Sequence, residues 1–439
     1  MNMNIILLSG GSGKRLWPLS NDVRSKQFIR LFKNGDKHES MVQRVYHQIQ
    51  RVDKDAKVTI ATSKSQVPAI HNQLGEEVSI CVEPMRRDTY PAIVLAAAYL
   101  HDKMGVKDDE PVVVCPVDPY VNDSYYEAVK QLGKLAGKTN LTLMGIEPTY
   151  PSEKYGYIIP ESKDKVSLVK EFKEKPDRKT AEKYLDEGAV WNAGIFAFKL
   201  SYMLNKAHKN LDFTDYQDLY DKYEACPKIS FDYAVVEKED SISVLRYKGE
   251  WRDVGTWNMM SEVMSDHVIG NATLDNTTTN THVINELDIP ILVMGAHDMV
   301  VAASGDGILV ADKEQSGYMK PYVTKVATRV RYADKSWGSY RIINVGPNNL
   351  TAKAFIKAGH RMTYHSHEYR DEVWTVLAGI GRAIVDGIEQ SVKAGSVITL
   401  PAECKHTIIA DTDLSLLETQ IGSKILISDK EKYFLNDRD

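Results

Sequence analysis

The chain has 439 residues, of which 43% are hydrophobic and 26% charged, and its formal net charge at pH 7 is −5. These values are typical of a soluble globular protein with two or three domains. The net negative charge gives no reason to expect a nucleic-acid or membrane partner, so any phosphate site has to be a local cluster of cations.

Targeting and redox features predict a cytoplasmic protein. No apolar run is long enough to span a bilayer, and the first eight residues lack the basic region and the apolar length of a signal peptide. The cysteines are far apart and form no CxxC pair, so we expect reduced, mostly buried thiols. They are Cys81, Cys115, Cys226 and Cys404.

In the first part of the chain, short apolar runs alternate with helical stretches. The predicted strands are residues 5–9, 57–62, 78–83, 111–118 and 141–148, with helices at 91–102 and 125–135 among the segments between them. Continuous apolar strands that alternate with helices predict a doubly wound, mostly parallel sheet covered on both faces. Such a sheet binds ligands at the carboxyl edge of its strands. We assign residues 1–265 to this α/β domain.

The rest of the chain changes in character. Residues 266–330 contain short β-branched strands broken by Gly, Asn and Asp, which predict a β-rich connector. Residues 331–439 again show many short strands at regular spacing, which predict a small barrel or sandwich.

A glycine-rich stretch, LSGGSGKRLWPL at residues 8–19, directly follows the first predicted strand. Such a loop can present backbone N–H groups to phosphate oxygens, and glycine lets the backbone approach closely. Arg15 and, after the turn, Lys26 can then neutralise charge. A plain structural turn explains the glycines equally well, and neither the GxxxxGK[ST] nor the GxGxxG order is present.

The whole string, LSGGSGKRLWPLS followed by SKQF, resembles the signature of the sugar-1-phosphate nucleotidylyltransferases. Ser9 and Trp17 are similar to the mannose-1-phosphate guanylyltransferase branch, whereas Lys14 and Ser25 stand where Thr and Pro are usual. Further motifs of the family follow in the expected order over about the first 265 residues. They are EPMRRDTYPAI (83–93), PVDPY (116–120), EKYGYI (153–158), VKEFKEKPD (169–177), WNAGIFAF (191–198), ISFDYAVVEK (229–238) and WRDVGTW (251–257).

The resemblance implies a Rossmann-like nucleotidyltransferase domain that transfers GMP from GTP to mannose 1-phosphate, giving GDP-mannose and pyrophosphate for polysaccharide biosynthesis. The attacking phosphate oxygen is already anionic, so such a reaction needs positioning and charge neutralisation rather than a general base. Another base, another hexose 1-phosphate, or a sugar-nucleotide sensor without turnover are the alternatives. The sequence leaves the oligomeric state open, and a homodimer is one state that it allows.

The family's site residues map onto this sequence one by one. The implied nucleotide contacts are Ser9, Gly10, Gly11, Gly13 and Lys14. Arg15 and Lys26 are expected at the pyrophosphate and Lys175 at the sugar phosphate. Gly156, Glu171 and Asn192 are expected to form the sugar pocket.

Two carboxylates resemble the Mg²⁺ ligands of this family. Asp118 follows an apolar strand, and Asp253 lies in a turn before a helix. Mg²⁺ prefers oxygen ligands and commonly uses one or two carboxylates together with substrate phosphates. A turn cap is the alternative role for Asp118.

Residues 359–379 fit the pattern G-x5-H-x-H-x4-E-x6-G. Alternation on a strand puts His365 and His367 on one face, and Glu372 can complete a metal site with them. A further histidine, His406, follows in a partial second motif, in which Glu403 replaces the usual Gly. Together the two motifs resemble the cupin β-barrel, and the four side chains suit Zn²⁺ or another divalent transition metal.

In long members of the family such a cupin is a phosphomannose isomerase, and KSWGSYRI at residues 335–342 is similar to the stretch that precedes it. The resemblance thus implies a second activity that interconverts mannose 6-phosphate and fructose 6-phosphate with help from the metal. The histidine motif, HSHEYRDEVW, is two residues longer before its glutamate than the usual HHHRxEHW. A metal-stabilised β domain with a structural or regulatory role is therefore the alternative.

Overall fold

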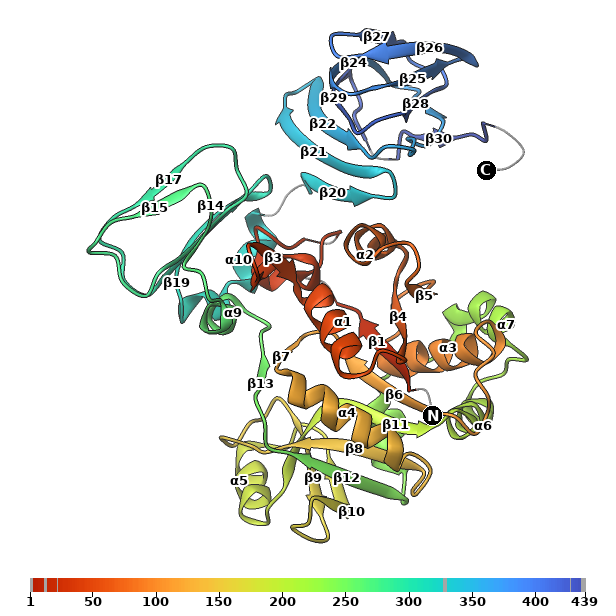
Figure 1. The fold of residues 1–439 in the computed structure, drawn as a ribbon, viewed down its shortest axis with the longest axis vertical. Helices are drawn as coiled ribbons and strands as arrows, with labels where there is room; N and C mark the ends of the chain where they lie inside the picture. Colours follow the sequence, from red (N-terminus) through yellow and green to blue (C-terminus); the bar gives the residue numbers. More distant parts are fainter. Residues whose placement is uncertain (1–2, 12–13, 22, 327–329, 427, 436–439) are drawn as a thin grey trace. The chain divides into compact units, whose positions relative to one another are not determined.

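The computed structural model describes residues 3–11, 14–21, 23–326, 330–426 and 428–435 (Figure 1). Contacts within the chain divide it into two compact units. The first comprises Met1–Ser12 and Gln27–Ser265, and the second comprises Gly13–Lys26 and Asp266–Asp439. The segment that carries Arg15 and Lys26 is thus grouped with the second half of the chain. The three-part division at residues 265 and 330 stays a prediction.

A nine-stranded sheet forms the centre of the first unit, in the order β5-β4-β1-β6-β11-β8-β12-β10-β9. Strands β5, β4, β1 and β6 run parallel, as do β8 and β12, whereas β11 pairs antiparallel with both β6 and β8. Strand β10 pairs antiparallel with β12 and β9, and β11 also pairs antiparallel with β9. The α/β class is confirmed, but the prediction of a mostly parallel sheet is wrong: the sheet is mixed, because the inserted strands β9, β10 and β11 run antiparallel to their neighbours. The strands are β1 (Asn4–Ser9), β4 (Lys57–Ser63), β5 (Ser79–Glu83), β6 (Pro111–Pro116), β8 (Leu141–Ile146), β9 (Gly156–Pro160), β10 (Val166–Lys173), β11 (Val190–Lys199) and β12 (Ile242–Tyr247).

Helices cover the sheet, with α1 packed beside α4 and α3 beside α6. Helix α3 is buried almost all round because it is rich in alanine and aliphatic residues, and it joins the main hydrophobic core with β1, β6 and β11. The helices are α1 (Met41–Val52), α2 (Val67–Leu74), α3 (Thr89–Asp102), α4 (Asp123–Leu135), α5 (Arg178–Asp186), α6 (Leu200–Asn210), α7 (Tyr216–Asp221), α8 (Phe231–Ala234) and α9 (Trp257–Val263).

Two small ribbons complete the first unit. Strands β2 (Arg30–Asn34) and β3 (Lys37–Ser40) form a hairpin before α1. Strands β7 (Pro119–Val121) and β13 (Trp251–Asp253) pair antiparallel although they are distant in the chain. Only Val117 and Asp118 separate β6 from this second ribbon, which therefore begins close to the carboxyl end of β6.

The second unit begins with short strands, as predicted for a β-rich connector. The strands β14 (Val268–Gly270), β16 (His282–Asn285), β18 (Met299–Ser304) and β19 (Gly307–Asp312) form one sheet, and β15 (Ala272–Leu274) pairs with β17 (Ile291–Val293). Helix α10 (Lys320–Val326) follows.

Two facing sheets then form the C-terminal β domain, shown in blue in Figure 1, which confirms the predicted cupin barrel. Side chains alternate along β24, so that Glu372, Trp374 and Val376 point into the core. The first sheet contains β20 (Tyr332–Lys335), β21 (Gly338–Val345), β22 (Asn349–Ile356), β29 (Leu414–Gly422), β24 (Arg370–Ala378) and β27 (Val397–Leu400). The second contains β26 (Ile388–Lys393), β25 (Ile380–Val385), β28 (His406–Ala410), β23 (His365–Ser366) and β30 (Glu431–Lys432).

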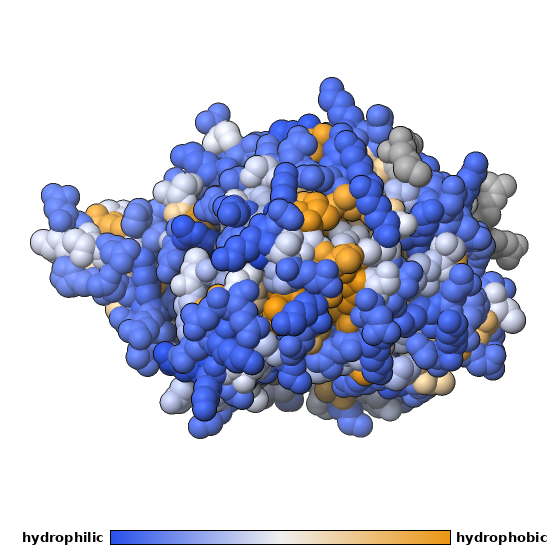
Figure 2. All heavy atoms as spheres, turned by 90° about the horizontal axis from the view of Figure 1, so that it is seen from below, coloured by the Kyte–Doolittle hydropathy of each residue, from blue (hydrophilic) through white to orange (hydrophobic). Residues whose placement is uncertain are grey.

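The surface is largely polar in the view of Figure 2, with apolar residues gathered mainly near the middle of that face. Within the described ranges, no helix combines the length and apolarity needed to cross a membrane. All four cysteines are free and buried.

Candidate functional sites

The loop after β1 exposes its backbone where the sequence predicts a phosphate site. Gly10 and Gly11 are exposed, and a Cβ added to either would meet nothing within 4 Å. Gly11 has φ +114°, which strongly favours glycine, and its carbonyl accepts a hydrogen bond from Arg86 at 3.2 Å. The predicted contact Gly13 lies outside the described residues.

Ser9 has interior partners instead of an open hydroxyl. Its side chain is fully buried and its Oγ accepts a hydrogen bond from Gln27 Nε2 at 3.1 Å, while Thr62 donates to its carbonyl at 3.1 Å. Ser9 therefore fixes the end of β1, and its neighbours Gly10 and Gly11 are the open positions.

The predicted phosphate-binding cations lie on residues 14–26, which we call the signature segment. Lys14 and Arg15 begin a short 3₁₀ helix, in which Arg15 is exposed, and a half-buried Lys26 begins another. All three belong to the second compact unit.

The signature segment is fastened to the β-rich connector by charged and polar contacts. Arg24 binds Glu286 through two hydrogen bonds of 2.8 and 2.9 Å, a geometry that fixes direction as well as distance. Ser304 donates to the carbonyl of Pro18 at 2.7 Å, and Asn21 donates to Asp306 at 2.7 Å. The connector thus holds the segment that carries Arg15 and Lys26.

The connector also accommodates the signature segment by shape. A Cβ on Gly307 would lie 2.4 Å from the Trp17 ring, and the φ of Gly307 is +153°. Only glycine fits at this position, because any side chain would overlap the indole.

The β7–β13 ribbon brings the backbone at the two predicted magnesium ligands close together. Asp253, the last residue of β13, lies opposite Pro119, the residue after Asp118. Both carboxylates are partly exposed. The pKa of Tyr155 is raised by burial and then by the charges of Asp253 and Asp118, so both carboxylates act on one ring.

Aromatic rings support the residues beside this carboxylate pair. Tyr155 packs against Trp191 at 4.9 Å and Trp251 at 5.5 Å between ring centroids. Trp191 is buried, as expected for a packing residue. These rings fix the turn that leads into β9 and Gly156.

A polar cluster forms around Gly156, the first residue of β9. A Cβ on Gly156 would lie 2.5 Å from Glu174 Oε2 and 3.3 Å from Asn192 Cβ, so glycine leaves room for both. Glu174 is buried and forms an ion pair with Lys175. Asn192 donates to Asp232 at 2.7 Å. Burial and the charge of Glu174 raise the pKa of Asp232 to about 6.

The structure separates Glu171 from this cluster. Glu171 is exposed on β10, where its Oε1 accepts a hydrogen bond from Tyr184 at 2.5 Å. The cluster therefore brings together the predicted residues Gly156, Asn192 and Lys175 and adds Glu174, which the sequence analysis missed. The available signal was the motif FxEKPD itself, whose glutamate aligns with Glu174 rather than Glu171.

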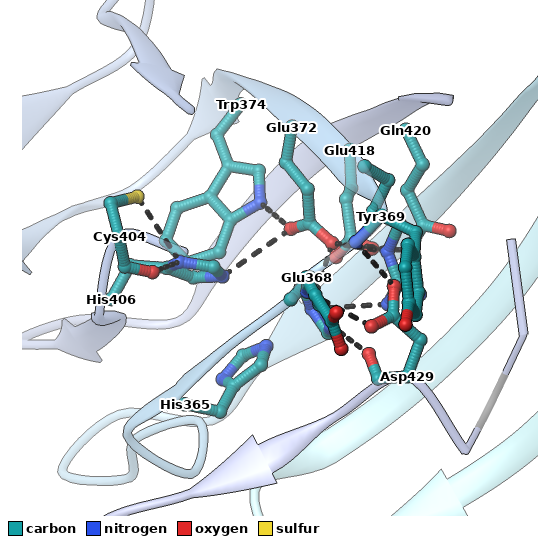
Figure 3. Close-up of polar contacts among 12 residues, drawn as sticks. His365, Glu368, Tyr369, Glu372, Trp374, Cys404, His406, Glu418, Gln420 and Asp429 are labelled. Atoms are coloured by element: carbon teal, nitrogen blue, oxygen red, sulfur yellow. Dashed lines mark hydrogen bonds and ion pairs between the residues drawn. The ribbon is translucent and has the colours of Figure 1, made fainter. Parts of the chain in front are cut away.

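The four predicted cupin ligands converge in the barrel, and Figure 3 labels three of them, His365, Glu372 and His406. Their ligand atoms all lie within 4.8 Å of one another, and none of the side chains is more than 4% exposed. His365 on β23 lies directly opposite His406 on β28, while Glu372 comes from β24 in the facing sheet. His367 lies just after β23.

Backbone carbonyls fix the tautomer of each histidine. The Nδ1 atoms of His365 and His406 lie 2.6 and 3.0 Å from the carbonyls of Thr363 and Cys404, and Nδ1 of His367 contacts the Asp429 carbonyl. A carbonyl only accepts hydrogen bonds, so Nδ1 carries the proton and the lone pair is on Nε2. In His367 this lone pair accepts a hydrogen bond from Arg370 Nη2 at 3.0 Å, which a bound metal would have to replace. Burial and then the charge of Lys430 lower the pKa of His365 to about 2, which keeps it neutral.

The buried Nε2 of His406 has no hydrogen-bond partner among the described residues and lies 3.6 Å from Glu372. Glu372 is oriented by donors: Arg370 Nε at 3.2 Å, Trp374 Nε1 at 3.1 Å and Gln420 at 3.3 Å. Neutral imidazole nitrogens and one carboxylate suit Zn²⁺, Mn²⁺ or Fe²⁺. The residues therefore fit a divalent transition metal.

Comparisons with known proteins also distinguish a nucleotidyltransferase region from a cupin region. A family model described as nucleotidyl transferase matches residues 4–268, and one described as cupin domain matches residues 354–419. Among curated proteins, the chain is 28% identical over 463 residues to a mannose-1-phosphate guanylyltransferase of Salmonella montevideo, covering 95% of this chain and 96% of the relative. It is 30% identical over 456 residues to the xanthan biosynthesis protein XanB of Xanthomonas campestris pv. campestris, covering 95% of each.

Among solved structures, a protein of Thermus thermophilus described as mannose-1-phosphate geranyltransferase has a TM-score of 0.63 and 28% sequence identity. The match covers 74% of this chain and 99% of that structure.

The histidine–glutamate cluster predicts metal-dependent stability. One Zn²⁺ added at about 100 times its Kd should raise the free energy of unfolding by about 2.7 kcal/mol, because the metal binds the folded cluster. His406→Ala should abolish this gain, as measured by thermal unfolding and metal analysis. His360→Ala is the matched control, because His360 also bonds a backbone carbonyl in the same domain but lies outside the cluster. An equal gain in both variants would contradict the assignment.

Proposed function

The chain belongs to the nucleotidyl transferase family and is an enzyme of that class, and from this premise we propose that it transfers GMP from GTP to mannose 1-phosphate. The products are GDP-mannose and pyrophosphate, and the pathway is polysaccharide biosynthesis. Two relatives that match nearly the whole chain are named mannose-1-phosphate guanylyltransferase and xanthan biosynthesis protein, which supports this substrate pair and this pathway. Cytoplasmic location and homodimer assembly stay predictions of the sequence.

The pairing of Asp253 with the residue next to Asp118 is the observation that carries the proposal. These carboxylates would hold Mg²⁺, which supplies positive charge to the phosphates when it is bound. Both residues are partly exposed; Asp253 is the last residue of β13, and Asp118 lies between β6 and β7. Tyr155 and its neighbouring indoles keep the turn beside them rigid.

Cations and backbone amides would supply the remaining charge neutralisation. The open backbone at Gly10 and Gly11 suits close approach by a triphosphate. Arg15 and Lys26 would stabilise the departing pyrophosphate, and Lys175 would bind the phosphate of the sugar. The nucleophile is an anionic oxygen, so no side chain has to remove a proton.

The polar cluster around Gly156 would bind the sugar. Asn192 and Glu174 would form hydrogen bonds with hydroxyl groups, since both are buried and held in place by Asp232 and Lys175. A buried carboxylate that accepts hydrogen bonds from hydroxyls discriminates strongly between sugars, because a missing hydroxyl leaves it unpaired.

Pyrophosphate release tests the proposal directly. GTP with mannose 1-phosphate and Mg²⁺ should give faster release than other nucleoside triphosphates or hexose 1-phosphates in the same panel. Asp253→Asn should lower kcat by about 100-fold or more, because it removes one negative charge from the two carboxylates proposed to hold Mg²⁺. Asp240→Asn, an exposed carboxylate elsewhere in the same unit, is the control. A normal rate in Asp253→Asn, or preference for another substrate pair, would overturn the assignment.

Two glutamates of one motif offer a matched comparison. Glu174→Gln should raise the KM for mannose 1-phosphate and lower kcat/KM by about 10-fold to 100-fold, the cost of about 1–3 kcal/mol for a lost charged hydrogen bond. Glu171→Gln should leave both parameters within about twofold, since Glu171 bonds only Tyr184 among the described residues. Steady-state kinetics with varied mannose 1-phosphate measure this difference. The reverse pattern would return the sugar-binding role to Glu171.

A second candidate activity concerns the cupin cluster. We hypothesise that the metal-loaded domain interconverts mannose 6-phosphate and fructose 6-phosphate, which the convergence of four buried ligand atoms favours. Fructose 6-phosphate should then form from mannose 6-phosphate, and a chelator or His406→Ala should stop it. Absence of product from protein shown to contain metal would leave the domain a structural or regulatory role.

A further inference from the structure

A second charged cavity lies in the first compact unit, outside the residues assigned to nucleotidyl transfer. It has a volume of about 920 Å³. Helix α4, the turn after β9 and the end of β12 supply six cations to its lining. They are Lys130, Lys134, Lys163, Lys165, Arg246 and Lys248.

The carboxylates near this cavity are too few to balance the cations. Glu127 is the one acidic residue in the lining. Glu147 is shared by Arg246 at 3.4 Å and Lys248 at 4.0 Å, and Lys130 is 3.5 Å from Asp53. The other three lysines have no carboxylate within 4.0 Å in the part of the chain that the structure describes. In a chain of net charge −5, this is a strong local excess of positive charge.

One of the cations in the wall of the cavity, Arg246, is buried and held in a fixed position. The Arg246 side chain is only 8% exposed and is held by Gly188 at 2.9 Å as well as by Glu147. Its buried Nε has no hydrogen-bond partner among the described residues. Arg246 therefore places a rigidly held positive charge in the wall of the cavity.

Neighbouring hydroxyls are fixed in the same wall. The Tyr247 hydroxyl lies 3.0 Å from Ser124 Oγ and donates to Asn122 at 3.2 Å. A Cβ on Gly249 would lie 2.1 Å from that hydroxyl, so this glycine makes room for it. Rigid polar groups therefore adjoin the lysines that surround the opening.

We propose that this cavity binds a small organic polyanion that carries two or more phosphate groups, at a site separate from nucleotidyl transfer. Assembling like charges costs electrostatic energy, which such a ligand offsets. Arginine recognises phosphate through paired donors, and lysines add point charges that tolerate different phosphate positions. The volume is in the upper range of small-molecule sites and suits a ligand of nucleotide size.

Inorganic tripolyphosphate is the probe, titrated calorimetrically into the full-length chain at fixed ionic strength. Lys26→Ala serves as the background, because it weakens the proposed catalytic phosphate site. In this background, Lys163→Glu with Lys165→Glu should raise the Kd by 10-fold or more. Lys228→Glu with Lys353→Glu, exposed lysines elsewhere, changes the net charge equally and should shift the Kd less than twofold.

Equal Kd values for the two double variants would overturn the proposal, because general charge would then explain binding. Loss of all binding in Lys26→Ala alone would also overturn it, since the catalytic site would be the one phosphate site. If the first pair of substitutions prevents folding, Lys134→Ala with Lys248→Ala should give the same 10-fold weakening. If the protein does not transfer guanylyl groups but the cavity variants still weaken tripolyphosphate binding more than the control variants do, only the proposed function is wrong and the cavity proposal is supported.

Discussion

The antiparallel pairing of β7 with β13 is the constraint on which the proposed chemistry depends. It joins the segment that follows β6 to a strand near the end of the first unit, and it pairs Asp253 with Pro119, the residue next to Asp118. Two carboxylates held close repel one another unless a cation lies between them or water screens them. Their partial exposure at the end of a ribbon satisfies both needs. The proposed Mg²⁺ would place such a cation between them.

A different device prepares the cupin cluster. There the protein controls the tautomers of three histidines through backbone carbonyls, which leaves the lone pair on Nε2 of each ring. Glu372 is likewise oriented by Arg370 and Trp374. Such outer contacts raise affinity because little reorganisation is needed on binding. The first unit relies on charge placed at a surface edge, whereas the cupin relies on buried, pre-oriented ligands.

The pattern of apolar residues along the chain is the signal that predicts the fold. Continuous hydrophobic runs identified β1, β4, β5, β6 and β8, and the order of the histidines and the glutamate identified the metal cluster, because both signals are local in sequence.

The two glutamates of the charged motif show where such reasoning ends. Both Glu171 and Glu174 lie in one charged stretch, and the sequence does not say where β10 stops. The chain leaves the strand after Lys173, so that the Glu174 side chain lies beside Gly156, and Lys175 then adopts φ +45°. The cationic cavity was also missed, since three distant segments build it.

The signature segment is held by a part of the chain that is distant from it in sequence. The motif is read as the start of the α/β domain, yet Arg24, Asn21 and Pro18 have their partners in the connector. Those partners, Glu286, Asp306 and Ser304, belong to none of the family motifs and are not among the predicted substrate-binding residues. They nevertheless determine how firmly the segment with Arg15 and Lys26 is held. A catalytic cation on a segment fastened in this way loses less conformational entropy when it binds a phosphate. The β-rich connector is therefore a positioning element for the proposed reaction and more than a spacer before the cupin.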